Sequence, residues 1–151
     1  MGALNGLVDS WLKGINVAHR ALVAVSGGRL GGKVMGMTSV ELHTMGRTSG
    51  RRRSVMLTAP IYEHDRVVLV ASKGGDDRHP DWYRNLVANP DVELTTSETT
   101  RPMRAHTADD TERAELWPRI VATYGGYADY QKRTDREIPV VVLVPRSSSD
   151  S

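Results

Sequence analysis

The 151-residue chain contains no cysteine. It therefore cannot form a disulfide, bind a metal or an iron–sulfur cluster through thiolates, or use a catalytic thiol. It also has no run of the roughly 20 apolar residues that cross a bilayer, and its N-terminus lacks the pattern of a secretory signal peptide. We expect a cytoplasmic protein.

An excess of charge of one sign is also lacking. Twenty Lys and Arg residues oppose eighteen Asp and Glu residues, so the net charge is only +2. Such a small excess does not predict a partner nucleic acid, and any anion site must be local. The five histidines lie on separate expected elements without ligand spacing, so no metal site is predicted.

The common nucleotide-binding motifs are missing as well. No segment has the G-x-G-x-x-G order of a dinucleotide-binding turn or the full G-x-x-x-x-G-K-S/T order of a Walker loop. ATP and NAD are thus poorly supported as ligands. The length suits one domain with its own core and leaves no room for two.

The N-terminal extension, residues 1–26, is expected to be helical. Its apolar residues recur at spacings of three and four between positions 4 and 22, which is typical of an amphipathic helix. Packing on its own domain is the favoured role for this helix. The alternative is an arm that rests on a membrane surface or covers a substrate mouth.

The rest of the chain alternates short apolar segments with a few helical ones. After a glycine-rich connector at 27–36 we expect a hairpin of two strands joined by residues 60–65, a later antiparallel pair, and an apolar central strand near the C-terminus. Pro118 is expected to kink a helix or delay its start, and the tail 147–151 to be disordered. The expected strands are 39–44, 54–59, 66–72, 92–96, 101–106 and 138–144, and the expected helices are 77–89, a segment from 110, and 127–134. This pattern predicts an α+β, mainly β fold: a small barrel with helical cover.

Three clusters could carry chemistry. The first, here called the arginine turn (residues 46–53), combines two glycines, two hydroxyl side chains and four arginines, and these groups suit a phosphate or a carboxylate. The second, the SKGG segment (residues 72–75), leaves a predicted strand through Ser72, Lys73, Gly74 and Gly75, which lets a ligand approach bare backbone. Solvated turns are the plain alternative for both.

The third cluster is a helix start at residues 79–86. Its N-terminus favours negative charge, and Trp82 could pack beside a ring or simply belong to the core. Further on, Tyr124, Tyr127 and Tyr130 recur every three residues around a Gly-Gly break. That spacing places them on nearly one face, either as an aromatic pocket or as a core stripe.

Together these stretches resemble the deazaflavin-dependent nitroreductase family of actinobacteria, within the split β-barrel flavin-binding superfamily. The stretches that carry the resemblance are GRTSG at 46–50 with Arg53, ASKGG at 71–75, HPDWYRNL at 79–86 with ANP at 88–90, TERAELWP at 111–118, the three tyrosines, and IPVV at 138–141. The resemblance implies an FMN-binding-like split barrel over residues 36–146. It also implies that the cofactor is coenzyme F420, a deazaflavin with a phosphate and an oligoglutamate tail.

The resemblance also implies roles for particular residues. The cofactor-binding set is Arg47, Thr48, Ser49, Gly50, Arg53, Met56, Leu57, Ala71, Ser72, Lys73, Gly74, Gly75, Pro80 and Trp82. The substrate-binding set is Thr58, Tyr124, Tyr127 and Tyr130. Tyr127, Tyr130 and Ser72 are expected to be catalytic, with Tyr127 as the main contact and Tyr130 as a proton donor. Thr58 stands where relatives often carry an aromatic residue.

The reaction implied is hydride transfer from the reduced deazaflavin to an electron-poor acceptor, such as menaquinone, a nitroimidazole-type compound, or an enone or coumarin ring. Because the cofactor carries the difficult step, the protein supplies binding, orientation and exclusion of water. Two alternatives stay open: a carrier that binds the deazaflavin without turnover, and a split barrel that binds FMN or haem. The chain could be a monomer or a homodimer, and the N-terminal helix could bring it to the inner face of the membrane.

Overall fold

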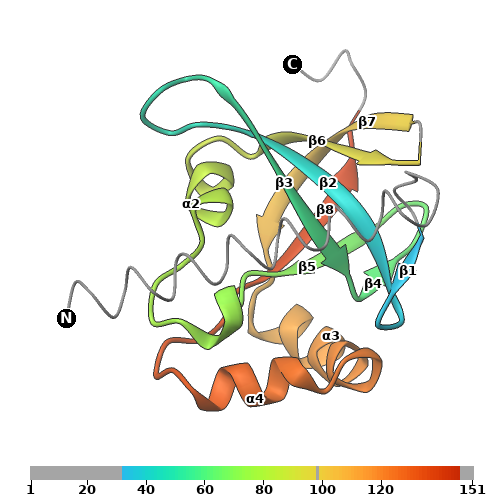
Figure 1. Ribbon diagram of the computed structural model, residues 1–151, viewed down its shortest axis with the longest axis vertical. Coiled ribbons are helices and arrows are strands. Elements are labelled where there is room, and N and C mark those ends of the chain that lie inside the picture. The colour runs from blue at the N-terminus through green and yellow to red at the C-terminus, as the bar shows by residue number, and fades with distance from the viewer. Residues whose placement is uncertain (1–31, 98, 147–151) are drawn as a thin grey trace.

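The computed structural model describes residues 32–97 and 99–146 (Figure 1). The expected N-terminal helix and the expected disordered tail therefore lie outside the described residues. The elements in chain order are β1 (Lys33–Val34), β2 (Met37–Met45), β3 (Arg52–Ala59), β4 (Ile61–Tyr62), β5 (Val67–Val70), the short 3₁₀ helix η1 (Lys73–Gly75), α2 (Asp81–Ala88), β6 (Asp91–Thr96), β7 (Thr99–Thr107), α3 (Asp110–Thr123), α4 (Gly126–Lys132) and β8 (Val140–Pro145).

All eight described strands form one antiparallel sheet. Its order is β1-β2-β6-β7-β8-β5-β4, and β3 pairs with β2. The sheet curls, and the three α-helices of the described residues divide into two groups, with α3 and α4 together below the strands and α2 beside them (Figure 1). This is the expected mainly β split barrel, so the predicted fold class is confirmed.

The central strand β8 has apolar side chains on both faces, so helices cover the sheet on both sides. Alternate residues of a strand point to opposite faces. Val141 and Leu143 belong to a core cluster that includes Leu86 of α2, whereas Val140 and Val142 belong to a second cluster. That second cluster also includes residues of α3 and α4. A strand buried on both faces has a continuous apolar sequence, and the sequence of β8 has this character.

The expected hairpin between residues 54–59 and 66–72 is wrong. Strand β3 pairs along its length with β2, from Thr38↔Ala59 to Met45↔Arg52. Of residues 52–62, Ile61 and Tyr62 alone pair with β5. A bend at the buried Pro60 separates β3 from β4. Because proline has a fixed φ and no N–H, it suits a break between two strands.

Three other boundaries differ from expectation. The connector at 27–36 contains strand β1, which pairs with β2. Helix α2 begins at Asp81, with Pro80 as its N-cap, because residues 76–79 make other contacts described below. Helix α3 runs through Pro118 without a late start. That proline is exposed, and the helix continues past it without the hydrogen bond that residue 118 cannot donate.

The start of α3 agrees with expectation. The side chain of Asp109 accepts a hydrogen bond of 2.8 Å from the Glu112 N–H, as an N-cap should. Among the residues that the structure describes, none of the helices has the length and apolar character needed to cross a bilayer.

Candidate functional site

The arginine turn joins β2 to β3 and is closed by its own backbone. The Gly46 N–H donates to the Arg51 carbonyl at 2.8 Å, and the Gly50 N–H donates to the Gly46 carbonyl at 2.9 Å. Gly50 has a φ of 67°, which a residue without Cβ adopts at little cost. Residues 47–53 are all exposed. The turn thus presents Arg47, Arg51, Arg52 and Arg53 to solvent on a defined backbone.

A buried amide on α2 fixes one end of this turn. The backbone N–H and the Nη1 of Arg47 both donate to Oδ1 of Asn85, at 3.1 and 2.8 Å. Asn85 is 5% exposed and donates through Nδ2 to Oγ1 of Thr44 at 3.3 Å. The Nη2 of Arg47 also lies 3.4 Å from Oδ1 of the exposed Asp81. Asn85 is therefore an anchor for Arg47, although it was not among the predicted site residues.

The SKGG segment has an unusual backbone. Ser72 is in the right-handed region, and Lys73, Gly74 and Gly75 follow with φ values of 47°, 65° and 85°. A right-handed residue followed by a left-handed one brings successive N–H groups to one side and makes a concavity suited to an anion. A left-handed conformation is rare for a residue with a side chain, and Lys73 adopts it here. Sequence composition identified this segment, but its conformation comes only from the structure.

Helix α4 packs directly against the SKGG segment. A Cβ placed on Gly75 would lie 2.9 Å from the carbonyl oxygen of Tyr130 and 3.0 Å from Cβ of Arg133. No side chain fits between the two backbones at this point. The close approach connects the segment to the helix that carries the tyrosines.

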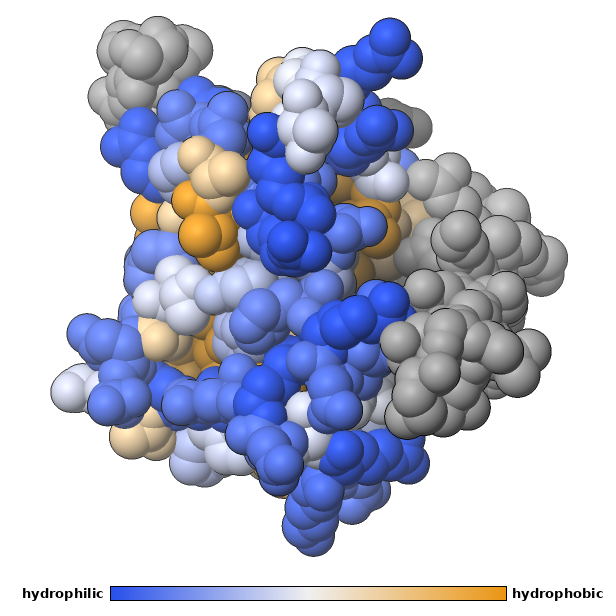
Figure 2. All heavy atoms as spheres, turned by 90° about the vertical axis from the view of Figure 1, so that its left-hand side faces the viewer, coloured by the Kyte–Doolittle hydropathy of each residue, from blue (hydrophilic) through white to orange (hydrophobic). Residues whose placement is uncertain are grey.

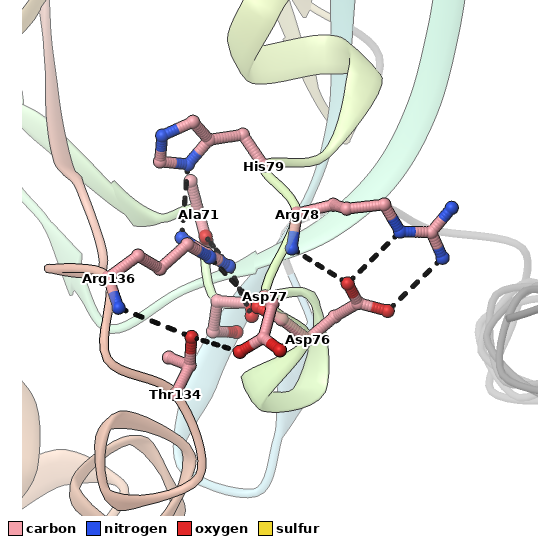
Figure 3. A network of polar contacts seen from close by, with 8 residues as sticks. Ala71, Asp76, Asp77, Arg78, His79, Thr134 and Arg136 are labelled. Atoms are coloured by element: carbon pink, nitrogen blue, oxygen red, sulfur yellow. Dashed lines mark hydrogen bonds and ion pairs between the residues drawn. The ribbon is translucent and has the colours of Figure 1, made fainter. Parts of the chain in front are cut away.

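A polar network holds the chain between the SKGG segment and α2 (Figure 3). The guanidinium of Arg136 donates to the carbonyl oxygens of Ala71, Ser72 and Asp76 at 3.2, 3.0 and 2.8 Å. Its Nη1 lies 3.1 Å from Nδ1 of His79. Arg136 was not predicted as a site residue. It is a single arginine in a loop, and its four contacts are with residues far away in the sequence.

The carboxylates of this network are also engaged. Thr134 donates to Oδ1 of Asp77 at 2.7 Å, and Arg78 binds the carboxylate of Asp76. Burial alone would raise the pKa of Asp76, but the hydrogen bonds and charge of Arg78, together with the charge of Lys73, lower it. Asp76 therefore stays ionised beside Lys73.

The three tyrosines form one aromatic cluster. The ring centroids of Tyr124 and Tyr127 are 5.2 Å apart, and those of Tyr127 and Tyr130 are 6.0 Å apart. The hydroxyls of Tyr124 and Tyr130 lie 3.4 Å from each other. Tyr127 is only 6% exposed, whereas the other two are half-buried. The spacing in the sequence thus predicted the cluster correctly, and it did not predict which ring is buried.

The phenols of the cluster are weak acids. Burial, more than any other cause, raises the pKa of Tyr127 to about 12. The pKa of Tyr130 is raised to about 12, first by burial and then by its hydrogen bond with Tyr124. Both hydroxyls therefore keep their protons throughout the neutral range, and each can donate a hydrogen bond.

Strand β3 divides its predicted site residues between two faces. Val55 and Leu57 pack against the first core cluster, so the Leu57 side chain lies in the barrel interior. Met56 and Thr58 occupy the opposite face, and Thr58 forms a hydrogen bond with Tyr127. The hydroxyl of Tyr127 also donates to Sδ of Met37 at 3.5 Å. The structure therefore brings Thr58 and the tyrosine cluster together, while Leu57 can line a site only through its backbone.

The arginine turn, α2 and the SKGG segment all lie on the left-hand side of Figure 1. Trp82 of α2 is partly buried against the first core cluster. Figure 2 looks onto this side of the molecule and shows a mostly hydrophilic surface with small hydrophobic areas between the hydrophilic side chains. Cationic side chains, a glycine-bearing segment and apolar surface thus occur together on one side.

Comparisons with known proteins agree on the relationship. The family described as F420H(2)-dependent quinone reductase matches residues 17–145. An F420H(2)-dependent quinone reductase of Mycobacterium tuberculosis is 40% identical over 135 residues, which are 85% of this chain and 88% of that protein. A solved structure described as an F420-H2 dependent reductase is 40% identical, with a TM-score of 0.63, and the match covers 70% of this chain and 92% of that one. A second, described as a domain-swapped dimer, has the same identity and TM-score and covers 70% and 78%.

Proposed function

This chain belongs to the F420H(2)-dependent quinone reductase family, and we propose that it passes a hydride from reduced coenzyme F420 to a quinone beside the tyrosines of α4. Members of the family are oxidoreductases, and their cofactor is coenzyme F420. The single observation that carries the proposed site is the presence, on one side of the barrel, of the arginine turn and the left-handed SKGG segment.

The described residues fit the anionic parts of this coenzyme. Its phosphate and glutamate tail need cations and N–H donors, and the arginine turn offers exposed guanidinium groups on a fixed backbone. Arg47 is held by Asn85, and Arg53 lies 3.5 Å from Oγ of Ser49. The backbone at residues 72–74 can add N–H groups and Lys73 adds a cation, whereas the N–H of Gly75 already donates to the Ser72 carbonyl at 2.9 Å. We assign Arg47, Thr48, Ser49, Gly50, Arg53 and Lys73 to the phosphate and tail.

For the deazaflavin ring we assign the backbone at 56–58 and at 71–75, with Met56, Pro80 and Trp82 at its border. When bound, the reduced coenzyme supplies the hydride. The protein's task is then to hold the ring and to exclude water from it. Ser72 is 8% exposed and its carbonyl oxygen accepts a hydrogen bond from Arg136, which supports our proposal that this residue holds a fixed position beside the ring.

On the acceptor side, Tyr130 and Tyr124 are the tyrosines that remain partly accessible. The high pKa of Tyr130 keeps its phenol protonated at neutral pH. It can therefore donate a hydrogen bond or a proton to a reduced acceptor oxygen. Tyr127 is committed to Thr58 and Met37, and we propose that it supports the pocket from beneath.

We propose a quinone, such as menaquinone, as the main acceptor. Nitroimidazole-type compounds and enone or coumarin rings would be secondary acceptors, because they are also electron-poor. The side chain of Thr58 is small, so it leaves more room beside β3 than an aromatic side chain would. It also forms a hydrogen bond with Tyr127. The domain-swapped relative supports a homodimer as the assembly. A cytoplasmic location, with membrane contact through residues 1–26, completes the proposal.

The proposed reaction is tested by mixing the protein with the reduced coenzyme and then adding menaquinone. We expect the absorbance of the oxidised deazaflavin to appear at a rate proportional to protein concentration. Binding of the coenzyme without oxidation by any quinone or nitro compound would instead identify a carrier. Stronger binding of FMN than of the deazaflavin would contradict the proposed cofactor site.

The Tyr130→Phe substitution tests the acceptor side. Because it removes a positioned proton donor, we expect turnover with menaquinone to fall by about tenfold or more, with coenzyme affinity unchanged. Tyr127→Phe is the comparison: its hydroxyl is buried against Met37, so we expect a loss of about 1 kcal/mol in unfolding free energy and a smaller effect on turnover. Steady-state rates and fluorescence titrations of both variants provide the readout. Unchanged turnover in Tyr130→Phe would remove this residue from the mechanism.

A further inference from the structure

Arg136 precedes β8 and joins segments that are far apart in the sequence. All three nitrogen positions of its guanidinium have acceptors within the protein, namely three backbone carbonyls and His79 (Figure 3). The carbonyls belong to Ala71, Ser72 and Asp76. These residues bracket Lys73, Gly74 and Gly75. The side chain of Arg136 thus forms hydrogen bonds at both ends of the left-handed segment.

The chemistry of arginine suits this task. Its guanidinium is planar and always charged, and it carries five N–H donors in a fixed geometry. Lysine has the same charge but only one nitrogen, so it cannot reach the same acceptors from one position. The half-buried Arg136 is tied from its own backbone as well, since its N–H donates to Oγ1 of Thr134 at 3.3 Å and Thr134 donates to Asp77.

The hydrogen bond from Arg136 to His79 can form only when the histidine ring is neutral. A guanidinium can only donate, so Nδ1 of His79 must be an acceptor, and this requires the proton of the neutral ring to be on Nε2. The charged and titratable groups that face His79 are Arg136, together with Arg84 and Tyr83 of α2. Asp76 and Asp77 act on the far side of Arg136. Protonation of His79 would set two cations against each other at a hydrogen-bonding distance.

We infer that Arg136 is a positioning residue for coenzyme binding: it holds the SKGG segment in its left-handed conformation, and neutral His79 serves as its fourth acceptor. The inference rests on the proposed function, because it assumes that this segment contacts the coenzyme. Arg136 acts through residues 72–75, and the protein provides four acceptors for its guanidinium. The site therefore depends on a contact that only the folded topology creates.

The direct test compares Arg136→Gln and Arg136→Lys with Arg146→Gln. Arg146 follows the same strand at its other end, is similarly shielded, and donates to the carbonyl oxygen of Met103 at 3.0 Å. We expect both Arg136 variants to raise the Kd for coenzyme F420 and the KM for its reduced form by roughly tenfold. We expect kcat at saturating coenzyme to stay within about twofold of wild type, and Arg146→Gln to leave Kd unchanged.

The pH dependence gives a readout that a purely structural role would not move. Burial, then the charges of Arg136 and Arg84, lower the pKa of His79. The neutral form is thus favoured in the folded state, and its contribution is complete above the ordinary pKa and is lost as the pH falls through the lowered pKa of the folded state. Coenzyme affinity of the wild type should therefore weaken as the medium is made acidic through this pKa. His79→Asn, whose amide oxygen can replace Nδ1 as an acceptor, should bind with a flatter pH profile.

Several outcomes would overturn the inference. Unchanged coenzyme affinity in Arg136→Gln would do so, and so would an equal loss in Arg146→Gln. If Arg136→Gln does not fold, as judged by its thermal unfolding, Arg136→Lys and His79→Asn decide the matter. The same pH profile in wild type and His79→Asn would exclude the histidine contact. Failure of the wild type to bind the coenzyme at all would instead contradict the proposed function.

Discussion

Replacing Lys73 and Arg53 together with alanine should weaken the binding of coenzyme F420 by about 100-fold or more. Each substitution removes a charge-assisted contact worth roughly 1.5 to 3 kcal/mol, and each 1.4 kcal/mol changes Kd about tenfold. Both side chains lie at the edges of their segments and outside the two core clusters, so the fold should tolerate their loss. The measurement is a fluorescence titration of the oxidised coenzyme against each purified variant.

A matched control is available elsewhere on the surface. Lys33→Ala with Arg104→Ala removes the same charge from β1 and β7, where the side chains contact Thr38 and Asp91. If loss of net charge alone weakened binding, the two double variants would behave alike. We expect the control to bind within about threefold of wild type, since long-range attraction between exposed charges is largely screened at physiological salt. Equal affinities for the wild type and the Lys73/Arg53 variant would exclude these two residues from the site.

The second large effect is expected from Gly75→Ala. At a φ of 85°, any residue with a Cβ is strained by about 1 to 2 kcal/mol. The new methyl group would also lie 2.9 Å from a backbone oxygen of Tyr130, an atom that cannot move without α4. We expect the unfolding free energy to fall by about 3 kcal/mol in total, and coenzyme binding to be lost as α4 and the SKGG segment separate.

Gly50→Ala separates the two causes. Gly50 also has a positive φ of 67°, but a Cβ there would meet no atom within 4 Å. Its cost should be only the backbone strain, about 1 kcal/mol. Urea unfolding of both variants gives the difference directly. Similar losses of stability in the two variants would mean that the contact between α4 and the SKGG segment is not tight.

Much of the fold could be predicted from the sequence because its cores follow simple periods. The apolar run at 138–144 predicts a strand buried on both faces, and β8 serves two core clusters. The rule that neighbouring strands usually pair does not decide the partner of β3, because β3 has a neighbour on each side along the chain. It pairs with β2 across the arginine turn, whereas Pro60 bends the chain and only the short β4 continues to β5. The continuity of α3 through Pro118 could not be predicted either, because a proline inside a helical pattern usually kinks or ends the helix.

The candidate site likewise contains residues that a local sequence pattern predicts and residues that only long-range contacts reveal. The parts that were predicted have a local signature: arginines between two glycines, a Lys-Gly-Gly strand exit, and tyrosines every three residues. Its supporting parts do not. Asn85 and Arg136 act on residues that are 38 to 65 positions away, and only the folded chain shows their partners. The exposed fractions of Tyr127 and Tyr130 also differ, although the two residues are equivalent in the sequence repeat.

The central claim is that this protein recognises coenzyme F420 by its anionic groups, through the arginine turn and the SKGG segment. The most direct measurement is the affinity of the wild type for the whole coenzyme and for the same deazaflavin without phosphate and tail, repeated with the Lys73/Arg53 double variant. We predict that the wild type binds the whole coenzyme at least about 100-fold more tightly, and that the double variant loses most of this preference. Equal affinity of the wild type for both ligands, or a preference that survives in the variant, would contradict the account.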